Sequence, residues 1–182
     1  MPDAPTDAVG LILQALADAP PRCGRVRVLA VDGGAAAGKT TLARRLADTI
    51  ADAALVHTDE LLDGWDDELT FWPRLRDSVL LPLERGRSAT VPRYDWHQRR
   101  FGPGWVLPAP DVLIVEGVSA IAATGRWLAL GVLLDVPRAE RERRWQERDG
   151  ALGPIEQRWL DREDGHFARP PLTDAPVLRL PG

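Results

Sequence analysis

The residue with the clearest chemical implication is Lys39, the only lysine among the 182 residues of the chain. It lies in the segment Gly33–Thr40, whose sequence GGAAAGKT fits the pattern G-x-x-x-x-G-K-[ST] of loops that hold nucleotide phosphates. A compact ammonium can enter such a loop and contact the β- and γ-phosphates, whereas the planar guanidinium of arginine cannot replace it there. We therefore predict that Lys39 contacts the phosphates of a nucleoside triphosphate and takes part in catalysis.

The segments on either side of this loop supply the context that the pattern requires. The apolar run 26–31 before it predicts a strand, and residues 41–47 after it predict a helix. Backbone N–H groups and the positive end of the helix would surround the phosphates, and the Thr40 hydroxyl is placed to ligate Mg²⁺. The alternative is a Gly/Ala-rich turn that fits the pattern by chance. The residues expected to bind the nucleotide are Gly33, Gly34, Ala35, Ala36, Ala37, Gly38, Lys39, Thr40 and Thr41.

Carboxylates stand at the ends of two further predicted strands, at the edge where open parallel sheets bind ligands. Asp59 follows the strand 54–58, and Glu116 ends the strand 112–116. Phosphoryl transfer to a hydroxyl needs a base for the acceptor and ligands for Mg²⁺. We expect Asp59 to orient and deprotonate the acceptor hydroxyl and Glu116 to hold Mg²⁺ through water. The alternatives are a helix cap for Asp59 and a solvated strand end for Glu116.

Aromatic and arginine side chains are concentrated between residues 65 and 105, an interval with seven of the chain's eleven aromatic residues. Aromatic faces together with guanidinium groups suit a flat ring with polar edges, such as a nucleobase. Tyr94 and Trp96 are the candidates for this contact, because Pro92 and several arginines flank them in a predicted loop. Packing within the protein is the equal alternative for both.

A charged run over residues 138–149 combines both signs at helical spacing, which usually marks a solvated helix face. Phosphoryl transfer also needs cations on the group in transit, and a mobile lid often delivers them. Arg144 and Arg148 lie one turn apart and precede Asp149-Gly150, which would act as a hinge. We predict that these two arginines are catalytic residues of a lid.

Strands and helices are predicted to alternate along the chain, which favours an α/β fold with a parallel sheet. The five predicted strands are nearly continuous apolar runs, as in sheets covered by helices on both faces: 26–32, 54–58, 112–116, 131–136 and 177–180. Helices are predicted at 6–19, 40–51, 71–85, 119–127 and 138–148. We expect one domain over residues 1–182, with a substrate-binding excursion at about 60–110 and a lid region at about 138–165.

The composition restricts the classes of partner and the setting. The formal net charge of −4 argues against general nucleic-acid binding. Cys23 is the single cysteine, so no internal disulfide can form and a reducing cytoplasm is expected. Residues 1–10 lack the features of a secretory signal, and no apolar run is long enough to span a bilayer. We expect a cytoplasmic protein without nucleic-acid or membrane partners, and the oligomeric state stays open.

Taken in order, these motifs resemble those of the uridine kinase family of P-loop nucleoside kinases, which is related to phosphoribulokinase and bacterial pantothenate kinase. The matching segments are the loop 31–41, Thr58-Asp59, the P-x-Y-D-aromatic motif 92–96, Val115-Glu116-Gly117 and the arginine-bearing segment 136–149. The resemblance covers roughly residues 26–177. It implies a P-loop NTPase three-layer sandwich and a kinase that uses ATP and Mg²⁺.

The chain departs from the family pattern at the acceptor site and in the lid. Arg99 stands where the family places a histidine after the tyrosine, and Arg148-Asp149-Gly150 replaces its R-G-R ending. Asp66 corresponds loosely to an acidic residue that contacts ribose hydroxyls in the family. The substrate-binding residues predicted from the resemblance are Asp66, Tyr94, Trp96 and Arg99.

Three interpretations of the function follow from these residues. The first is a kinase that transfers the γ-phosphoryl group of ATP to a nucleoside hydroxyl, with a uridine- or cytidine-like acceptor. The second keeps the kinase chemistry with another small molecule, such as a pantothenate-like or sugar compound. The third is a nucleotide-binding switch or ATPase. A switch has no evident use for the aromatic cluster, and the N-K-x-D motif of GTPases cannot occur because Lys39 is the only lysine.

Overall fold

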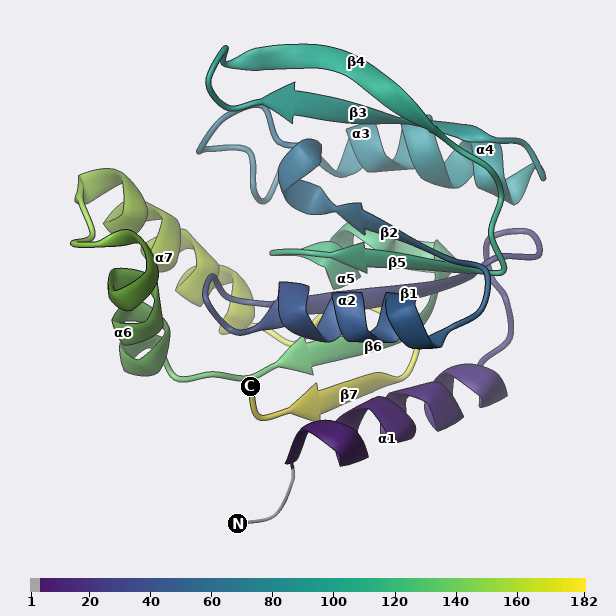
Figure 1. Cartoon of the computed structure of the whole chain (residues 1–182), viewed down its shortest axis with the longest axis horizontal. Helices are drawn as coiled ribbons and strands as arrows, with labels where there is room; N and C mark the ends of the chain where they lie inside the picture. Colours follow the sequence, from purple (N-terminus) through teal and green to yellow (C-terminus); the bar gives the residue numbers. More distant parts are fainter. Residues whose placement is uncertain (1–3) are drawn as a thin grey trace.

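The computed structural model describes residues 4–182, and its centre is a five-stranded parallel sheet (Figure 1). The strands are β1 (Arg27–Gly33), β2 (Ala53–His57), β5 (Val112–Glu116), β6 (Leu128–Leu134) and β7 (Val177–Leu180). Their order is β2-β5-β1-β6-β7, with every neighbouring pair parallel. The carboxyl ends of β1, β2 and β5 therefore lie at the same edge of the sheet, and the predicted α/β fold is confirmed.

Helices cover both faces of the sheet because its central strands are apolar on both sides. On one face, Leu29 and Val31 of β1 belong to an apolar cluster with α1 (Ala4–Asp18) and α2 (Lys39–Thr49). On the other face, Val28 and Ala30 belong to a second cluster, which includes α5 (Ala120–Thr124). These two clusters and the sheet between them form the three layers predicted for a P-loop NTPase sandwich.

The second face also carries a helical segment at residues 72–84, close to the predicted helix 71–85. It consists of α3 (Trp72–Leu75), a π-helical turn (Arg76–Leu80) and α4 (Leu81–Glu84). The buried side chains of Leu75, Val79, Leu80 and Leu83 attach this segment to the core. It supports the base of the excursion that was predicted at about 60–110.

The excursion contains an antiparallel hairpin where the sequence predicted a loop. Its strands are β3 (Ala89–Asp95) and β4 (Arg100–Leu107), and they form a separate two-stranded sheet. The register shifts between Val91 and Arg93, where Pro92 interrupts the pairing. Most of β4 is exposed or only half-buried, so this strand lacks the apolar run that identifies the strands of the main sheet.

Two helices after β6 occupy the predicted lid region, α6 (Arg138–Asp149) and α7 (Pro154–Phe167). In Figure 1 they form a pair beside the carboxyl end of the sheet. The sequence predicted α6 but not α7, because α7 is rich in charged residues and has few apolar ones. No helix in the part of the chain that the structure describes is long and apolar enough to cross a membrane.

Candidate active site

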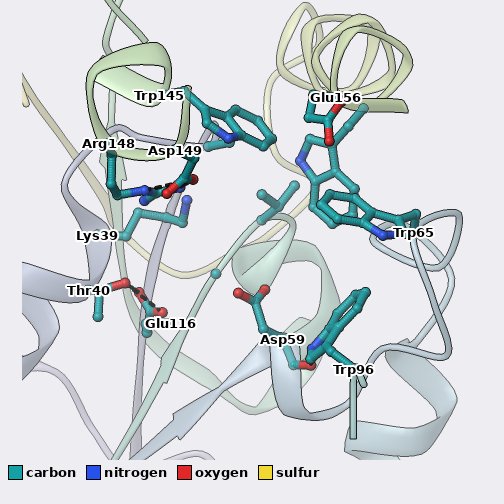
Figure 2. Close-up of a pocket in the computed structure, with 14 residues that line it drawn as sticks. Lys39, Thr40, Asp59, Trp65, Trp96, Glu116, Trp145, Arg148, Asp149 and Glu156 are labelled. Atoms are coloured by element: carbon teal, nitrogen blue, oxygen red, sulfur yellow. Dashed lines mark hydrogen bonds and ion pairs between the residues drawn. The ribbon is translucent and has the colours of Figure 1, made fainter. Parts of the chain in front are cut away.

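A pocket of about 400 Å³ lies at the carboxyl ends of β1, β2 and β5, beneath the α6–α7 pair (Figure 2). Its walls come from six separate parts of the chain. The lining residues include Ala35, Lys39, Thr40, Asp59, Trp65, Trp96, Glu116, Trp145, Arg148, Asp149, Glu156 and Trp159. The structure thus brings residues predicted from the phosphate loop, from the strand ends and from the lid to one cavity.

The phosphate loop connects β1 to α2, and the ammonium group of Lys39 is held by the backbone of the loop. Lys39 is 9% exposed and donates a hydrogen bond from Nζ to the Gly34 carbonyl oxygen at 2.8 Å. A side chain at position 34 would displace the guanidinium of Arg141, which occupies the space beside Gly34. The loop is therefore fixed by contacts on both of its sides.

The predicted nucleotide-binding residues divide into those that reach the pocket and those that shape it. Ala35, Lys39 and Thr40 line the cavity. The remaining residues of the set lie at the end of β1, in the loop or in the first turn of α2 and do not line it: Gly33, Gly34, Ala36, Ala37, Gly38 and Thr41. Ala36 and Gly38 have positive φ values of 59° and 95°, which turn the chain sharply before α2 begins.

Thr40 and Glu116, the two predicted metal ligands, are in direct contact. The Thr40 hydroxyl donates to the Glu116 carboxylate at 3.1 Å, and Glu116 is 4% exposed. Glu116 also bonds His57 Nδ1 at 3.0 Å, and this hydrogen bond raises the pKa of His57 above its ordinary value. Gly117 lets the chain turn away from the strand end, since a side chain there would collide with Thr58.

The oxygen atoms of Thr40 and Glu116 suit a hard cation such as Mg²⁺, which prefers oxygen ligands and usually takes one or two carboxylates. In residues 4–182, no group of three or more His, Cys, Asp or Glu side chains is arranged to hold a metal ion. A cation bound here would need further ligands from water or from substrate phosphates. That requirement agrees with the way Mg²⁺ binds in phosphoryl-transfer sites.

Asp59 lies in a 3-10 turn (Thr58–Glu60) directly after β2, and its carboxylate points into the pocket (Figure 2). The side chain is exposed, but it faces a cavity with protein on several sides. Loss of water raises its pKa above the ordinary value, Lys39 opposes the shift and Glu116 adds to it. Asp59 is not the cap of this turn, because the N-cap position is His57 and no side chain makes a capping hydrogen bond there. A carboxylate in this position can accept a proton from a bound hydroxyl.

The two predicted lid arginines lie in different surroundings. Arg148 lines the pocket, where it pairs with Asp149 at 2.6 Å (Figure 2). Arg144 pairs with Glu140 at 2.7 Å on α6 and does not line the pocket. The two arginines lie on the same side of α6 but one turn apart along its axis, and the α6 residues that line the cavity, Trp145, Arg148 and Asp149, belong to its C-terminal part. In this conformation, the prediction of a phosphoryl contact has structural support for Arg148 alone.

Of the predicted substrate residues Tyr94 and Trp96, only Trp96 lines the pocket. Trp96 is 37% exposed, lines the pocket and donates from Nε1 to the Asp59 carbonyl oxygen at 3.3 Å. Tyr94 is 8% exposed and lies behind it, with ring centroids 5.1 Å from Trp96 and 5.2 Å from Phe101. Residues two apart on a strand point to the same face, yet Trp96 follows the end of β3 and is free to turn toward the cavity.

Two other predicted substrate residues do not line the pocket. Asp66 has a largely exposed side chain and pairs with Arg162 of α7 at 3.1 Å. Arg99 is exposed at the turn between β3 and β4, with a φ of 52°. Both positions were carried over from the family resemblance, and the structure places the tip of the hairpin and the Asp66 side chain outside the cavity.

Several pocket residues were not predicted, and most come from the lid helices. Trp145 of α6 and Trp159 of α7 are buried and line the cavity, and Trp65 contacts both Trp96 and Trp159 edge to face at 5.6 and 5.5 Å. The sequence contains a signal for two of them, since tryptophans at 145 and 159 interrupt helices that are otherwise strongly charged. Glu156 of α7 completes this wall.

Glu163 of α7 is a buried carboxylate that contacts the phosphate loop itself. It accepts hydrogen bonds from the Ala35 backbone N–H at 2.9 Å, from Trp159 and from the buried guanidinium of Arg141 at 2.8 Å. Burial raises the pKa of Glu163 above its ordinary value. Through this carboxylate, α7 is attached to the loop and carries Trp159 and Glu156 to the opposite side of the pocket. Nothing in the sequence pattern indicated this role.

Comparisons with known proteins were made for the sequence and for the fold. No family model matches the chain. A uridine kinase of Borrelia duttonii (strain Ly) is 28% identical over 140 residues, which cover 68% of each chain. A uridine kinase of Halobacterium salinarum is 28% identical over 110 residues, 52% of this chain and 48% of the relative.

Solved structures share the fold. A protein from Silicibacter sp. TM1040, provisionally named a fructose transport system kinase, has a TM-score of 0.66 and 20% identity, with 97% of this chain and 98% of that chain covered. A possible uridine kinase from Bacillus stearothermophilus has a TM-score of 0.61 and 18% identity, with 94% and 98% covered. The relatives and the structural neighbours support the family resemblance that the motifs predicted.

Proposed function

We propose that this uridine kinase-like P-loop kinase transfers the γ-phosphoryl group of ATP to a hydroxyl group of a nucleoside, with Mg²⁺ as cofactor. The observation that carries the proposal is the division of the pocket into two sides (Figure 2). Lys39, Thr40 and Arg148 lie on one side, and the Asp59 carboxylate lies across from them beside Trp96. A donor phosphate and an acceptor hydroxyl can meet between these groups.

The residues have distinct roles in the proposed reaction. The acceptor hydroxyl oxygen bonds to the γ-phosphorus, the bond from that phosphorus to the bridging oxygen of ADP breaks, and Asp59 accepts the hydroxyl proton. Lys39 and Arg148 stabilise the negative charge on the oxygens of the transferring group. Thr40 and Glu116 would hold Mg²⁺, which neutralises phosphate charge when it is bound.

The aromatic wall supports a ring-bearing acceptor. Trp65, Trp96 and Trp159 line the part of the pocket next to Asp59, and stacking on indole faces is a general way to bind a planar base. A switch or regulatory ATPase would not need such a wall beside a base. A cytoplasmic location, expected from the single cysteine, and a small molecule as the partner belong to the same proposal.

The test is a measurement of ADP formation with ATP, Mg²⁺ and a panel of nucleosides, sugars and pantothenate-like compounds, with product mass determined for each. We expect ADP formation to depend on a nucleoside and to yield the nucleoside monophosphate. Asp59→Asn is the matched control, because it keeps the shape of the side chain and removes the base. ADP formation that needs no acceptor would contradict the proposal in favour of an ATPase, and a phosphorylated sugar alone would contradict the nucleoside.

A further inference from the structure

The charged residues of the pocket are unevenly distributed between its two sides. Both cations that line it, Lys39 and Arg148, lie on the side of the phosphate loop (Figure 2). Lys39 is held by the Gly34 carbonyl oxygen, and Arg148 is held by Asp149. The charged residues among the tryptophans on the other side are Asp59 and Glu156, both carboxylates. The acceptor side is therefore aromatic and acidic, with no cation among the residues that line it.

Two arginines that contact neighbouring residues of this side, Arg162 and Arg93, have their own partners and do not line the pocket. Arg162 pairs with Asp66 and Glu68 and donates to the Trp65 carbonyl oxygen, and Arg93 lies 3.7 Å from Glu60. An acceptor with a carboxylate or phosphate group would thus meet carboxylates without a compensating cation. Like charges brought together in a partly dry site disfavour binding of such an acceptor.

Glu156 of α7 lines the cavity, and one of its two carboxylate oxygens is engaged in a hydrogen bond with the backbone. Its Oε2 accepts the Gly153 backbone N–H at 2.9 Å, which caps the first turn of α7. Capping alone would explain a carboxylate or an amide at this position. However, Glu156, Trp159 and Glu163 have the i, i+3, i+7 spacing of one helix face, and this face lines the pocket and contacts the loop. The second oxygen of Glu156 is therefore placed as an acceptor at the edge of a ring that stacks among the tryptophans.

We propose that Glu156 determines acceptor specificity, so that the site selects an uncharged or cationic ring with an amino group, as in cytosine or adenine, and rejects anionic acceptors. This inference rests on the proposed kinase function of the same pocket. An exocyclic amine can donate to the free oxygen of Glu156. A ring with a carbonyl oxygen at that edge would place two acceptors against each other, and a site built for a hydrogen bond rejects a ligand that cannot form it.

The decisive variant is Glu156→Gln, measured by kcat/KM for cytidine and for uridine at saturating ATP. The cap requires an acceptor, so the amide oxygen should remain on the Gly153 N–H and the NH₂ group should face the pocket as a donor. We expect the wild type to prefer cytidine by about tenfold or more, and the variant to lose or invert this preference while KM for ATP changes less than about twofold. Glu147→Gln, on the exposed surface of α6, is the matched control and should leave the ratio unchanged.

A second comparison uses the wild-type protein alone and so does not depend on how the variant folds. Uridine and 5-carboxyuridine differ by one carboxylate, and we expect kcat/KM for the carboxylated compound to be lower by at least about tenfold. A cytidine-to-uridine ratio that is the same in Glu156→Gln and the wild type, or equal turnover of the carboxylated compound, would overturn the inference. Phosphorylation of an amino sugar and of no nucleoside would contradict the nucleoside proposal. If Glu156→Gln then lowered the activity on the amino sugar, selection of an amine by Glu156 would still be supported.

Discussion

The two sides of the pocket are built in different ways. The phosphate side is a single turn of backbone between β1 and α2, to which Lys39, the buried carboxylate of Glu116 and the lid residue Arg148 are added. The acceptor side consists of side chains from the turn after β2, the hairpin and the lid helices. Phosphates have the same shape in every nucleotide, so backbone groups can bind them, whereas an acceptor has to be recognised by particular side chains. Changes on the phosphate side should therefore reduce turnover of every acceptor, and changes on the other side should alter the choice among them.

The largest effect is expected at Lys39. Lys39→Ala should abolish turnover, with a loss of about 10³-fold or more, because it removes the cation that contacts the β- and γ-phosphates. Lys39→Arg should be nearly as damaging, since the guanidinium does not fit the space beneath Gly34. Initial rates of ADP formation with several acceptors would measure both. An arginine variant with nearly wild-type activity would contradict this account of the single lysine.

Asp59→Asn should reduce kcat by roughly 10²–10⁴-fold, the usual scale for the loss of a general base. Affinity for ATP should stay within a few fold, because Asp59 faces the acceptor. The base works in its deprotonated form and its pKa is raised, so wild-type kcat/KM should fall as the pH drops through this raised value. The same acidic limb should be missing from the residual activity of the variant. A large loss of ATP binding would assign Asp59 to the phosphate side instead.

Arg148 and Arg144 test whether the lid conformation described here is the one that reacts. Arg148→Ala should lower kcat by about 10²-fold, the scale for losing one group that stabilises transition-state charge. Arg144→Ala should have a much smaller effect, because its guanidinium pairs with Glu140 outside the pocket. Steady-state kinetics of the two variants provide the comparison. Equal and large losses would mean that the lid moves Arg144 into the site during the reaction.

The smallest effects are expected on the acceptor side. Trp96→Ala should raise KM for the acceptor by about 5- to 150-fold, as expected for one stacking contact of roughly 1–3 kcal/mol, and leave KM for ATP nearly unchanged. Tyr94→Ala should mainly lower the melting temperature, because this ring is packed behind Trp96. Acceptor kinetics and melting curves on both variants would distinguish a side chain that contacts the acceptor from one that only packs behind it. If Trp96→Ala raised KM for the acceptor and KM for ATP equally, the role of Trp96 would be packing and not contact with the acceptor.

Sequence patterns predicted the main sheet well where an apolar run had a clear end. The predicted strands 112–116 and 177–180 coincide with β5 and β7. β6 begins at Leu128 instead of residue 131, because apolar residues continue without interruption from 127 to 134 and mark no boundary. The β3–β4 hairpin was missed because its outer strand is mostly exposed, and α7 was missed because its stability depends on capping and on a few buried side chains.

The sequence by itself determined the phosphate side of the pocket. Its groups are contiguous in the chain or end a neighbouring apolar strand, and parallel pairing of β1 with β5 brings Thr40 and Glu116 together without further information. Only the tertiary structure decided the acceptor side, where Trp96 rather than Tyr94 faces the cavity and α7 supplies Glu156 and Trp159. It also decided which lid arginine reaches the phosphate side, Arg148 rather than Arg144. These outcomes depend on the rotation of a helix or strand end and on packing between segments far apart in sequence. Neither the residue types nor their spacing contain that geometry.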